Sequence, residues 1–460
     1  MPRRASTQYG ILAGLLLLIL TVLVLIGGFT PVMTPDSAGY MVEPGWPDMF
    51  AVERPPFYRW LVVVLTLDGR APGLLAVAQI ALYVAAAGWL MRCLHATGLP
   101  GDAVLAVGIT LLLANALLLM GNWVHPEVPA IALALAALGT TVRLVHSPHL
   151  SWPLLLLLVG SGGGAYLLRP SFLPIIIAFP VCGMLWRLAS WQRARTGRAA
   201  VLMLALALPF LLVASLRLAV VRDFNIVSFG GFQMSGLAAL TLSAETLPRL
   251  PQDARPLAEA VLAARSAGEA NGSMIGVPRN SFGIRSFHSA ALGYFDVLAR
   301  THDEVLYGIV IQQRQPDESW VAFNRRLQRW SIAVLTATPE RHVTWMIGAT
   351  TRLIGRAMMT NLPFGLGVLA LVLVVPLLWL RRIDVPRMER TQGKPDPFTA
   401  LVLLGGGWML GSGVLMVVVT FPAWRYIDSC AILLAAPVWL LVIQRIRLLL
   451  APAPQLARTG

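Results

Sequence analysis

The sequence predicts an all-α polytopic membrane protein with about ten or eleven transmembrane helices and a mainly helical extracytoplasmic insertion. The first observation is composition, because the 460 residues are 57% hydrophobic and 13% charged, whereas soluble domains carry about 25% charged residues. The second is that the apolar residues gather into blocks of about 20, the length that crosses a hydrocarbon core about 30 Å thick. Together they exclude a soluble chain, a single-span receptor, an outer-membrane barrel and a disordered scaffold.

Ten apolar runs are the predicted spans. The first run follows Arg3 and Arg4 and resembles a signal peptide, but its apolar part is about 18 residues long and no small-residue cleavage site follows. We therefore expect it to be retained as a span. The ten runs are 11–29, 71–92, 102–120, 126–145, 152–168, 171–187, 199–220, 362–380, 399–420 and 427–448.

Basic residues decide the orientation of these spans, because loops that stay inside the cell carry an excess of arginine and lysine. With the N-terminus inside, the inside loops hold many more arginines than the short outside loops. Both termini are then cytoplasmic, and the net charge of +14 reflects topology, so we expect no nucleic-acid partner. Lys394 is the only lysine, a composition typical of a high-GC bacterium. We expect a multi-pass protein of a bacterial cytoplasmic (inner) membrane.

One long polar segment interrupts the spans and divides the chain into an N-terminal transmembrane module (1–220), an extracytoplasmic insertion (221–360) and C-terminal transmembrane helices (361–460). Helical patterns in the insertion cover 253–270, 286–304 and 316–337. Pro316 followed by Asp317 and Glu318 is typical of a first helical turn, and Thr338-Pro339-Glu340 has the same character. The second of these opens a helix at about 339–360, which either lies at the membrane surface or forms an eleventh span.

Polar residues that are out of place in so apolar a chain lie on the outside by this topology. Ionisable groups at a membrane boundary cost free energy unless they are paired or solvated, so their accumulation on one face predicts a functional site. Snorkelling arginines and interfacial aromatic belts are the alternative explanation. The candidates are Asp36, Tyr40, Arg54 and Tyr58 in the first outer loop (30–70), His125 and Glu127 where the fourth span opens, Arg169 between the fifth and sixth spans, and Arg425 and Tyr426 before the last span.

The order of these features resembles the GT-C class of membrane glycosyltransferases. The stretch from Asp36 to Tyr40 is similar to the Asp-x-x-x-Tyr of the first outer loop in that class. Arg54-Pro55-Pro56-Phe57-Tyr58 resembles the (Arg/His)-Pro-Pro-aromatic segment of protein mannosyltransferases and lipid A aminoarabinose transferases. Glu127 is similar to a Glu-x-Pro in these relatives, and Arg425-Tyr426 to a late Arg-Tyr pair. The resemblance covers the layout of the chain, most firmly residues 1–190.

The resemblance implies a GT-C-like fold and an inverting glycosyltransferase that moves a sugar from a polyprenyl-phosphate carrier to an extracytoplasmic acceptor, which is a protein, a lipid or a cell-envelope glycan. Asp36 would then be the catalytic base that accepts the proton of the acceptor hydroxyl. Arg54, Arg169 and Arg425 would bind the leaving phosphate, because a guanidinium is a planar fork suited to phosphate oxygens. Tyr40, Tyr58, His125, Glu127 and Tyr426 would contact substrate, with membrane lipids around the bundle.

Metal use is the point at which the sequence departs from the class. Members often place a second acid directly after the first, whereas Ser37 stands here. No acidic pair is spaced for a metal, and one histidine beside one carboxylate, as in His125 and Glu127, is more typical of a hydrogen-bonded pair. We expect no cofactor and no metal ligands, with a divalent metal as the open alternative.

Two other functions fit parts of the pattern. A lipid or small-solute transporter or flippase would also have about ten spans, but such proteins place ionisable residues near the bilayer midplane and show repeated halves. The span interiors here hold few ionisable residues, and no repeat is visible. An O-antigen polymerase or ligase-type enzyme would share the lipid-linked donor with a different loop arrangement.

Overall fold

The structure is a computed structural model that describes residues 2–34, 36–41, 45–46, 48–67, 70–189, 196–270, 305–380, 396–419 and 429–450. Within these ranges every regular element is a helix, and the one β-bridge pairs Val32 with Trp123. Six helical stretches are long and apolar enough to cross a membrane. They are α4 (Gly73–Ala96), Gly101–Leu118 with α5 (Gly101–Leu112) and α6 (Asn115–Leu118), α7 (Glu127–His146), Pro170–Ala189 with η2 (Pro170–Phe172) and α9 (Ile175–Ala189), α10 (Thr196–Val221) and α17 (Leu362–Leu380).

The remaining four predicted spans also fall on helices. These are α1 (Pro2–Leu25), α8 (Trp152–Leu168), α18 (Pro397–Val419) and α20 (Ala436–Leu450). The all-α architecture is therefore confirmed for the described residues, whereas ten or eleven crossings remain a prediction beyond the six stretches above. The first outer loop contains three short helices that the apolar pattern did not predict: α2 (Ser37–Met41), η1 (Asp48–Phe50) and α3 (Pro56–Leu65).

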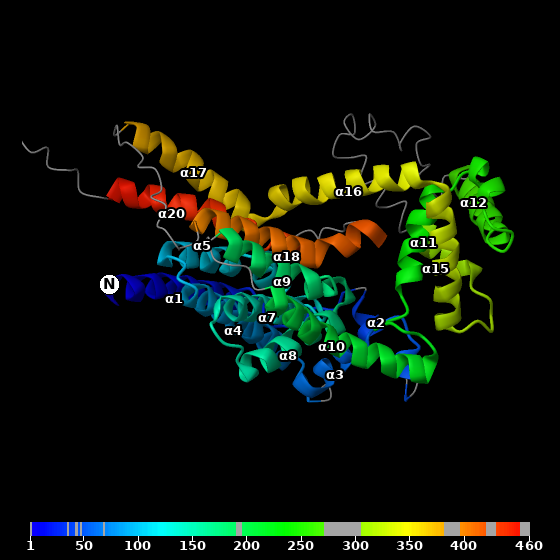
Figure 1. Cartoon of the computed structure of the whole chain (residues 1–460), viewed down its shortest axis with the longest axis horizontal. Coiled ribbons are helices and arrows are strands. Elements are labelled where there is room, and N and C mark those ends of the chain that lie inside the picture. Colours follow the sequence, from blue (N-terminus) through cyan, green and yellow to red (C-terminus); the bar gives the residue numbers. More distant parts are fainter. Residues whose placement is uncertain are drawn as a thin grey trace, which may run out of the picture.

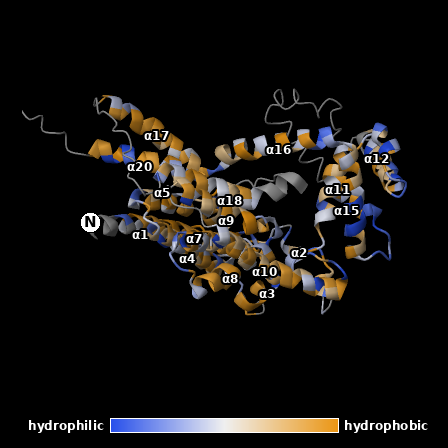
Figure 2. Cartoon of the chain, in the orientation of Figure 1, coloured by the Kyte–Doolittle hydropathy of each residue, from blue (hydrophilic) through white to orange (hydrophobic). Residues whose placement is uncertain are grey.

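Helix α7 lies at the centre of the bundle. It packs against α4, α8 and α9, and its side chains are buried on almost every face, as expected for a helix that is apolar all round. Gly139 lets α7 approach α4 closely, since a Cβ there would lie 3.0 Å from Leu90 Cα. Figure 1 shows these helices running roughly side by side, and Figure 2 shows that most of their residues are hydrophobic.

The insertion forms a second hydrophobic core beyond one end of the bundle (Figure 1). Its helix α12 matches the predicted 253–270, and the predicted helix 286–304 lies outside the described residues. Helix α11 was not predicted. The described elements are α11 (Gly230–Thr241), η3 (Ala244–Arg249), α12 (Arg255–Ala270), η4 (Leu306–Val310), η5 (Ile311–Gln313), α15 (Trp320–Ala337) and α16 (Pro339–Thr360).

The predicted start of α15 at Pro316 is wrong. The helix begins at Trp320, because Ser319 is its N-cap and accepts a hydrogen bond from the Ala322 amide at 3.2 Å. The start of α16 at Pro339 is as predicted. This helix is not among the described stretches that are long and apolar enough to cross a membrane. In Figure 1 it runs from the bundle to the insertion.

Candidate functional site

The first outer loop is attached to the segment that precedes α7. The Val32 amide donates to the Asn122 carbonyl at 2.9 Å, and the Val124 amide donates back to the Val32 carbonyl at 3.0 Å. Ser37 Oγ then donates to the Val124 carbonyl at 2.8 Å. Asp36 directly precedes this buried serine, so these backbone contacts place its carboxylate next to His125.

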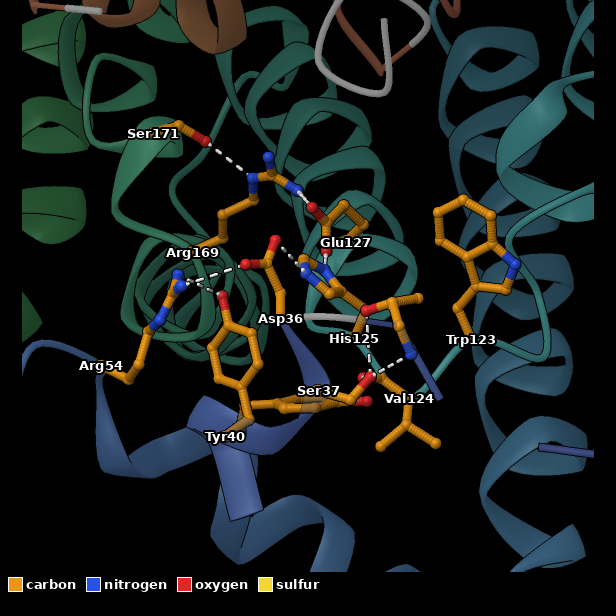
Figure 3. A network of polar contacts seen from close by, with 12 residues as sticks. Asp36, Ser37, Tyr40, Arg54, Trp123, Val124, His125, Glu127, Arg169 and Ser171 are labelled. Carbon is orange, nitrogen blue, oxygen red and sulfur yellow. Dashed lines mark hydrogen bonds and ion pairs between the residues drawn. The ribbon is translucent and has the colours of Figure 1, made fainter. Parts of the chain in front are cut away.

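Five ionisable side chains form a continuous series of contacts, in the order Arg54, Asp36, His125, Glu127 and Arg169 (Figure 3). Arg54 Nη2 lies 3.3 Å from Asp36 Oδ1, and His125 Nε2 lies 3.5 Å from Asp36 Oδ2. The other ring nitrogen of His125 contacts Glu127, and the second carboxylate oxygen of Glu127 contacts Arg169. The side chain of Asp36 is 22% exposed, whereas those of His125 and Glu127 are 4% and 2% exposed. Only the end of this series that holds Arg54 (23% exposed) and Asp36 is thus substantially open.

Helix ends explain why these groups meet. Glu127 is the first residue of α7, as predicted, and a carboxylate there also faces the positive end of the helix dipole. Helix α8 packs against α7 and is joined to it by the short segment 147–151, so the end of α8 lies beside the start of α7. Arg169 directly follows the last residue of α8, and its Nε donates to Ser171 Oγ at 3.0 Å. The ends of two adjacent helices therefore bring Glu127 and Arg169 together.

Aromatic rings surround Arg54 and determine where its guanidinium lies. Its Cζ is 5.0 Å from the centroid of Tyr40 and 5.3 Å from that of Phe229, and Nη1 donates to the Tyr40 hydroxyl at 3.3 Å. Tyr40 also meets the edges of Tyr58 and His125, with centroids 5.4 and 5.2 Å apart. Cation–π and edge-to-face contacts of this kind favour one orientation of each group.

Tyr58 supports this arrangement from inside the protein. Its side chain is fully buried, and its hydroxyl donates to Gln79 Oε1 at 3.3 Å. The Gln79 amide in turn donates to the carbonyls of Gly121 and Trp123 at 3.2 and 3.0 Å. Burial, and secondarily Tyr40, raise the pKa of Tyr58 well above its ordinary value, so the phenol stays neutral.

Seven of the nine predicted site residues are thus brought together: Asp36, Tyr40, Arg54, Tyr58, His125, Glu127 and Arg169. The other two, Arg425 and Tyr426, lie outside the described residues. The expected pairing of His125 with Glu127 is confirmed. The catalytic and binding roles assigned to these residues remain predictions.

Three supporting residues were not predicted. Gln79 carried a signal, because it is an amide within an apolar run. Ser37 stands where the GT-C class often has a second acid, and that difference by itself predicts no supporting role. Phe229 carried no signal, since an aromatic residue at the start of the insertion is unremarkable in sequence and only the fold places it on Arg54.

The site does not converge on a single point as a metal site would. The two nitrogens of His125 face Asp36 and Glu127 on opposite sides of the ring. Across the part of the chain that the structure describes, no group of three or more His, Cys, Asp and Glu side chains is placed to hold a metal ion.

Comparison of the chain with protein-family models, with curated proteins and with solved structures finds no match.

Proposed function

We propose that the chain is an inverting glycosyltransferase that moves a sugar from a polyprenyl-phosphate carrier to an acceptor on the outer face of a bacterial cytoplasmic membrane. The observation that carries the proposal is the position of Asp36, a partly exposed carboxylate held between Arg54 and His125 beside an apolar helix bundle. An acceptor on the outer face and a membrane-bound donor would meet at such a place.

Asp36 is the base of the proposed reaction. The acceptor oxygen attacks the anomeric carbon and forms the new glycosidic bond, its proton passes to Asp36, and the bond to the polyprenyl phosphate breaks on the opposite face. His125 cannot turn freely, because Glu127 holds one ring nitrogen while the other faces Asp36. Glu127 thus orients the His125 imidazole toward the carboxylate of Asp36.

Arg54 is the better placed of the two described arginines to receive the leaving phosphate. Its side chain is 23% exposed, whereas Arg169 is 10% exposed and is paired with the buried Glu127. A phosphate would compete with Asp36 for the same guanidinium, and an ion pair exchanged in this way stabilises the charge that develops on the leaving group. Arg169 would then act through Glu127. The apolar surface of the bundle would hold the prenyl tail.

The test compares wild type, Asp36→Asn and Asp48→Asn. Each purified protein is incubated with short-chain polyprenyl-phosphate sugars, and release of free polyprenyl phosphate is measured. We expect release by wild type, a loss of about 100-fold or more in Asp36→Asn, the lower end of the effect of a general base, and wild-type release from Asp48→Asn. Asp48 is the matched control, because it is an exposed aspartate of the same outer loop. Equal release by all three would contradict the role of Asp36.

One observation favours a second function, a proton-coupled transporter. The contacts from Asp36 through His125 to Glu127 form an acid–imidazole–acid series, which is also how proton relays in transporters are built. This function predicts no release from any donor, together with proton-driven solute uptake in proteoliposomes that Asp36→Asn abolishes.

A further inference from the structure

Arg217 is a buried cation that the proposed reaction does not use. It lies near the end of α10 and is 1% exposed. Its guanidinium donates to Asp223 at 3.0 Å, to Ser228 Oγ at 2.6 Å and to the Phe50 carbonyl of the first outer loop. Contacts of this kind to Nη1 and Nη2 offset part of the cost of burying the guanidinium charge. One side chain therefore attaches both ends of the linker 223–228, which leads into the insertion, to the loop that carries Asp36 and Arg54.

The residue after this linker is Phe229, and two contacts determine its position. Its ring stacks on Trp320 of α15 at 6.3 Å with 28° between the planes. The Trp320 indole N–H donates to the Ser228 carbonyl, directly before Phe229. The insertion, through α15, thus decides where the Phe229 ring lies.

The other partner of that ring is the guanidinium of Arg54, 5.3 Å from its centroid. Arg54 therefore has Tyr40 from the outer loop and Phe229 from the insertion as aromatic neighbours, with Asp36 as its ion-pair partner. Aromatic contacts with a guanidinium restrict it to the geometry in which the rings and the carboxylate are satisfied together.

We propose that Phe229 is a positioning residue through which the insertion holds Arg54 on Asp36. Its effect on turnover rests on the proposed function, but its effect on Arg54 does not. The insertion is then part of the site, and an acceptor that moves α15 would also move Arg54.

The first test measures Arg54 itself. Wild type, Phe229→Leu, Phe229→Tyr and Phe224→Leu are treated with phenylglyoxal, and modification of Arg54 is followed by mass spectrometry relative to Arg70. We expect Phe229→Leu to raise the rate of Arg54 modification about tenfold. Loss of the ring removes a contact that shifts the equilibrium between the held and the released guanidinium by about tenfold. Phe229→Tyr keeps a ring and should recover most of the protection.

Phe224→Leu is the matched control. Phe224 belongs to the same linker and is 50% exposed, but its ring meets Phe210 and not Arg54. An unchanged rate in Phe229→Leu overturns the proposal, and so does an equal rise in Phe224→Leu, because that would indicate general loosening of the linker. Phe229→Met supplies a second ring-free side chain if the leucine variant does not fold.

The second test is a double-mutant cycle on release of polyprenyl phosphate. We expect Phe229→Leu to lower kcat/KM about tenfold with Arg54 present and to have no further effect in an Arg54→Ala background. A loss of equal size in both backgrounds contradicts positioning through Arg54. Absence of release by wild type overturns the proposed function alone, because the modification rates still decide the role of Phe229.

Discussion

At the scale of single residues, the interior end of the site depends on the pair of Glu127 and Arg169. Both side chains are largely buried, and the charge of each is compensated by the opposite charge of the other. Glu127 also holds the imidazole of His125. Breaking a buried ion pair leaves the remaining charge uncompensated in a low-dielectric environment, which costs far more than losing an exposed pair.

We therefore expect Glu127→Gln to lower the free energy of unfolding by about 3 kcal/mol. The measurement is denaturant-induced unfolding in detergent, with Glu53→Gln as the control, because Glu53 is an exposed carboxylate of the first outer loop and such substitutions change stability by about 0.5 kcal/mol or less. Adding Arg169→Met to Glu127→Gln should restore part of the loss. A stability equal to that of the control would show that the pair is solvated.

At the scale of elements, the turn before α15 connects charge to helix initiation. Glu318 accepts hydrogen bonds from Arg326 Nε at 2.8 Å and Nη2 at 2.6 Å, two turns into the helix. These bonds are the main cause that lowers the pKa of Glu318 below its ordinary value. Ser319 caps the same helix, so the turn at 316–319 is a compact start for α15.

This pKa predicts a pH dependence. A carboxyl whose pKa is lower in the folded state contributes stability above its unfolded pKa of about 4.3 and loses that contribution as pH falls through the lower folded value. We expect Glu318→Gln to lower the melting temperature at pH 7, and to differ less from wild type at pH 3. Asp317→Asn, at an exposed neighbour, is the control. A constant difference between Glu318→Gln and wild type at all pH values would contradict the linkage.

At the scale of the whole molecule, the topology predicts which ends of the bundle face outward. The insertion and α2 of the first outer loop lie toward the same end in Figure 1, and charge counting predicts that this end faces outside. The three cysteines, Cys93, Cys182 and Cys430, are buried. Introduced cysteines can therefore report sidedness with little background.

We expect a membrane-impermeant maleimide to label Glu259→Cys on α12 in intact cells, and to label Ala96→Cys at the end of α4 only after lysis. Both positions are exposed, so access to the reagent depends on the side of the membrane. Wild type provides the background of the native cysteines. Labelling of Ala96→Cys but not of Glu259→Cys in intact cells would show that the orientation is the opposite of the predicted one.

Local pattern was enough for the helical architecture and for the helix ends that matter to the site. Apolar runs located the bundle helices, and Glu127 opens α7 as predicted, because hydropathy and helix-start signals act over a few neighbouring residues. The start of α15 was missed, since both Pro316 and Ser319 are acceptable first-turn signals and the Glu318–Arg326 contact favours the later one.

For the site, residue type and predicted sidedness were enough to select Asp36, Arg54, His125, Glu127 and Arg169. Pairing was decided only by the tertiary structure, which places Arg54 on Asp36 and Arg169 on Glu127. The same holds for Phe229, which lies far from Arg54 in sequence. Its ring contacts Arg54 because Arg217 and Trp320 hold the preceding residue, Ser228, in place. Contacts between distant segments depend on how whole helices pack, and neither composition nor periodicity encodes that packing.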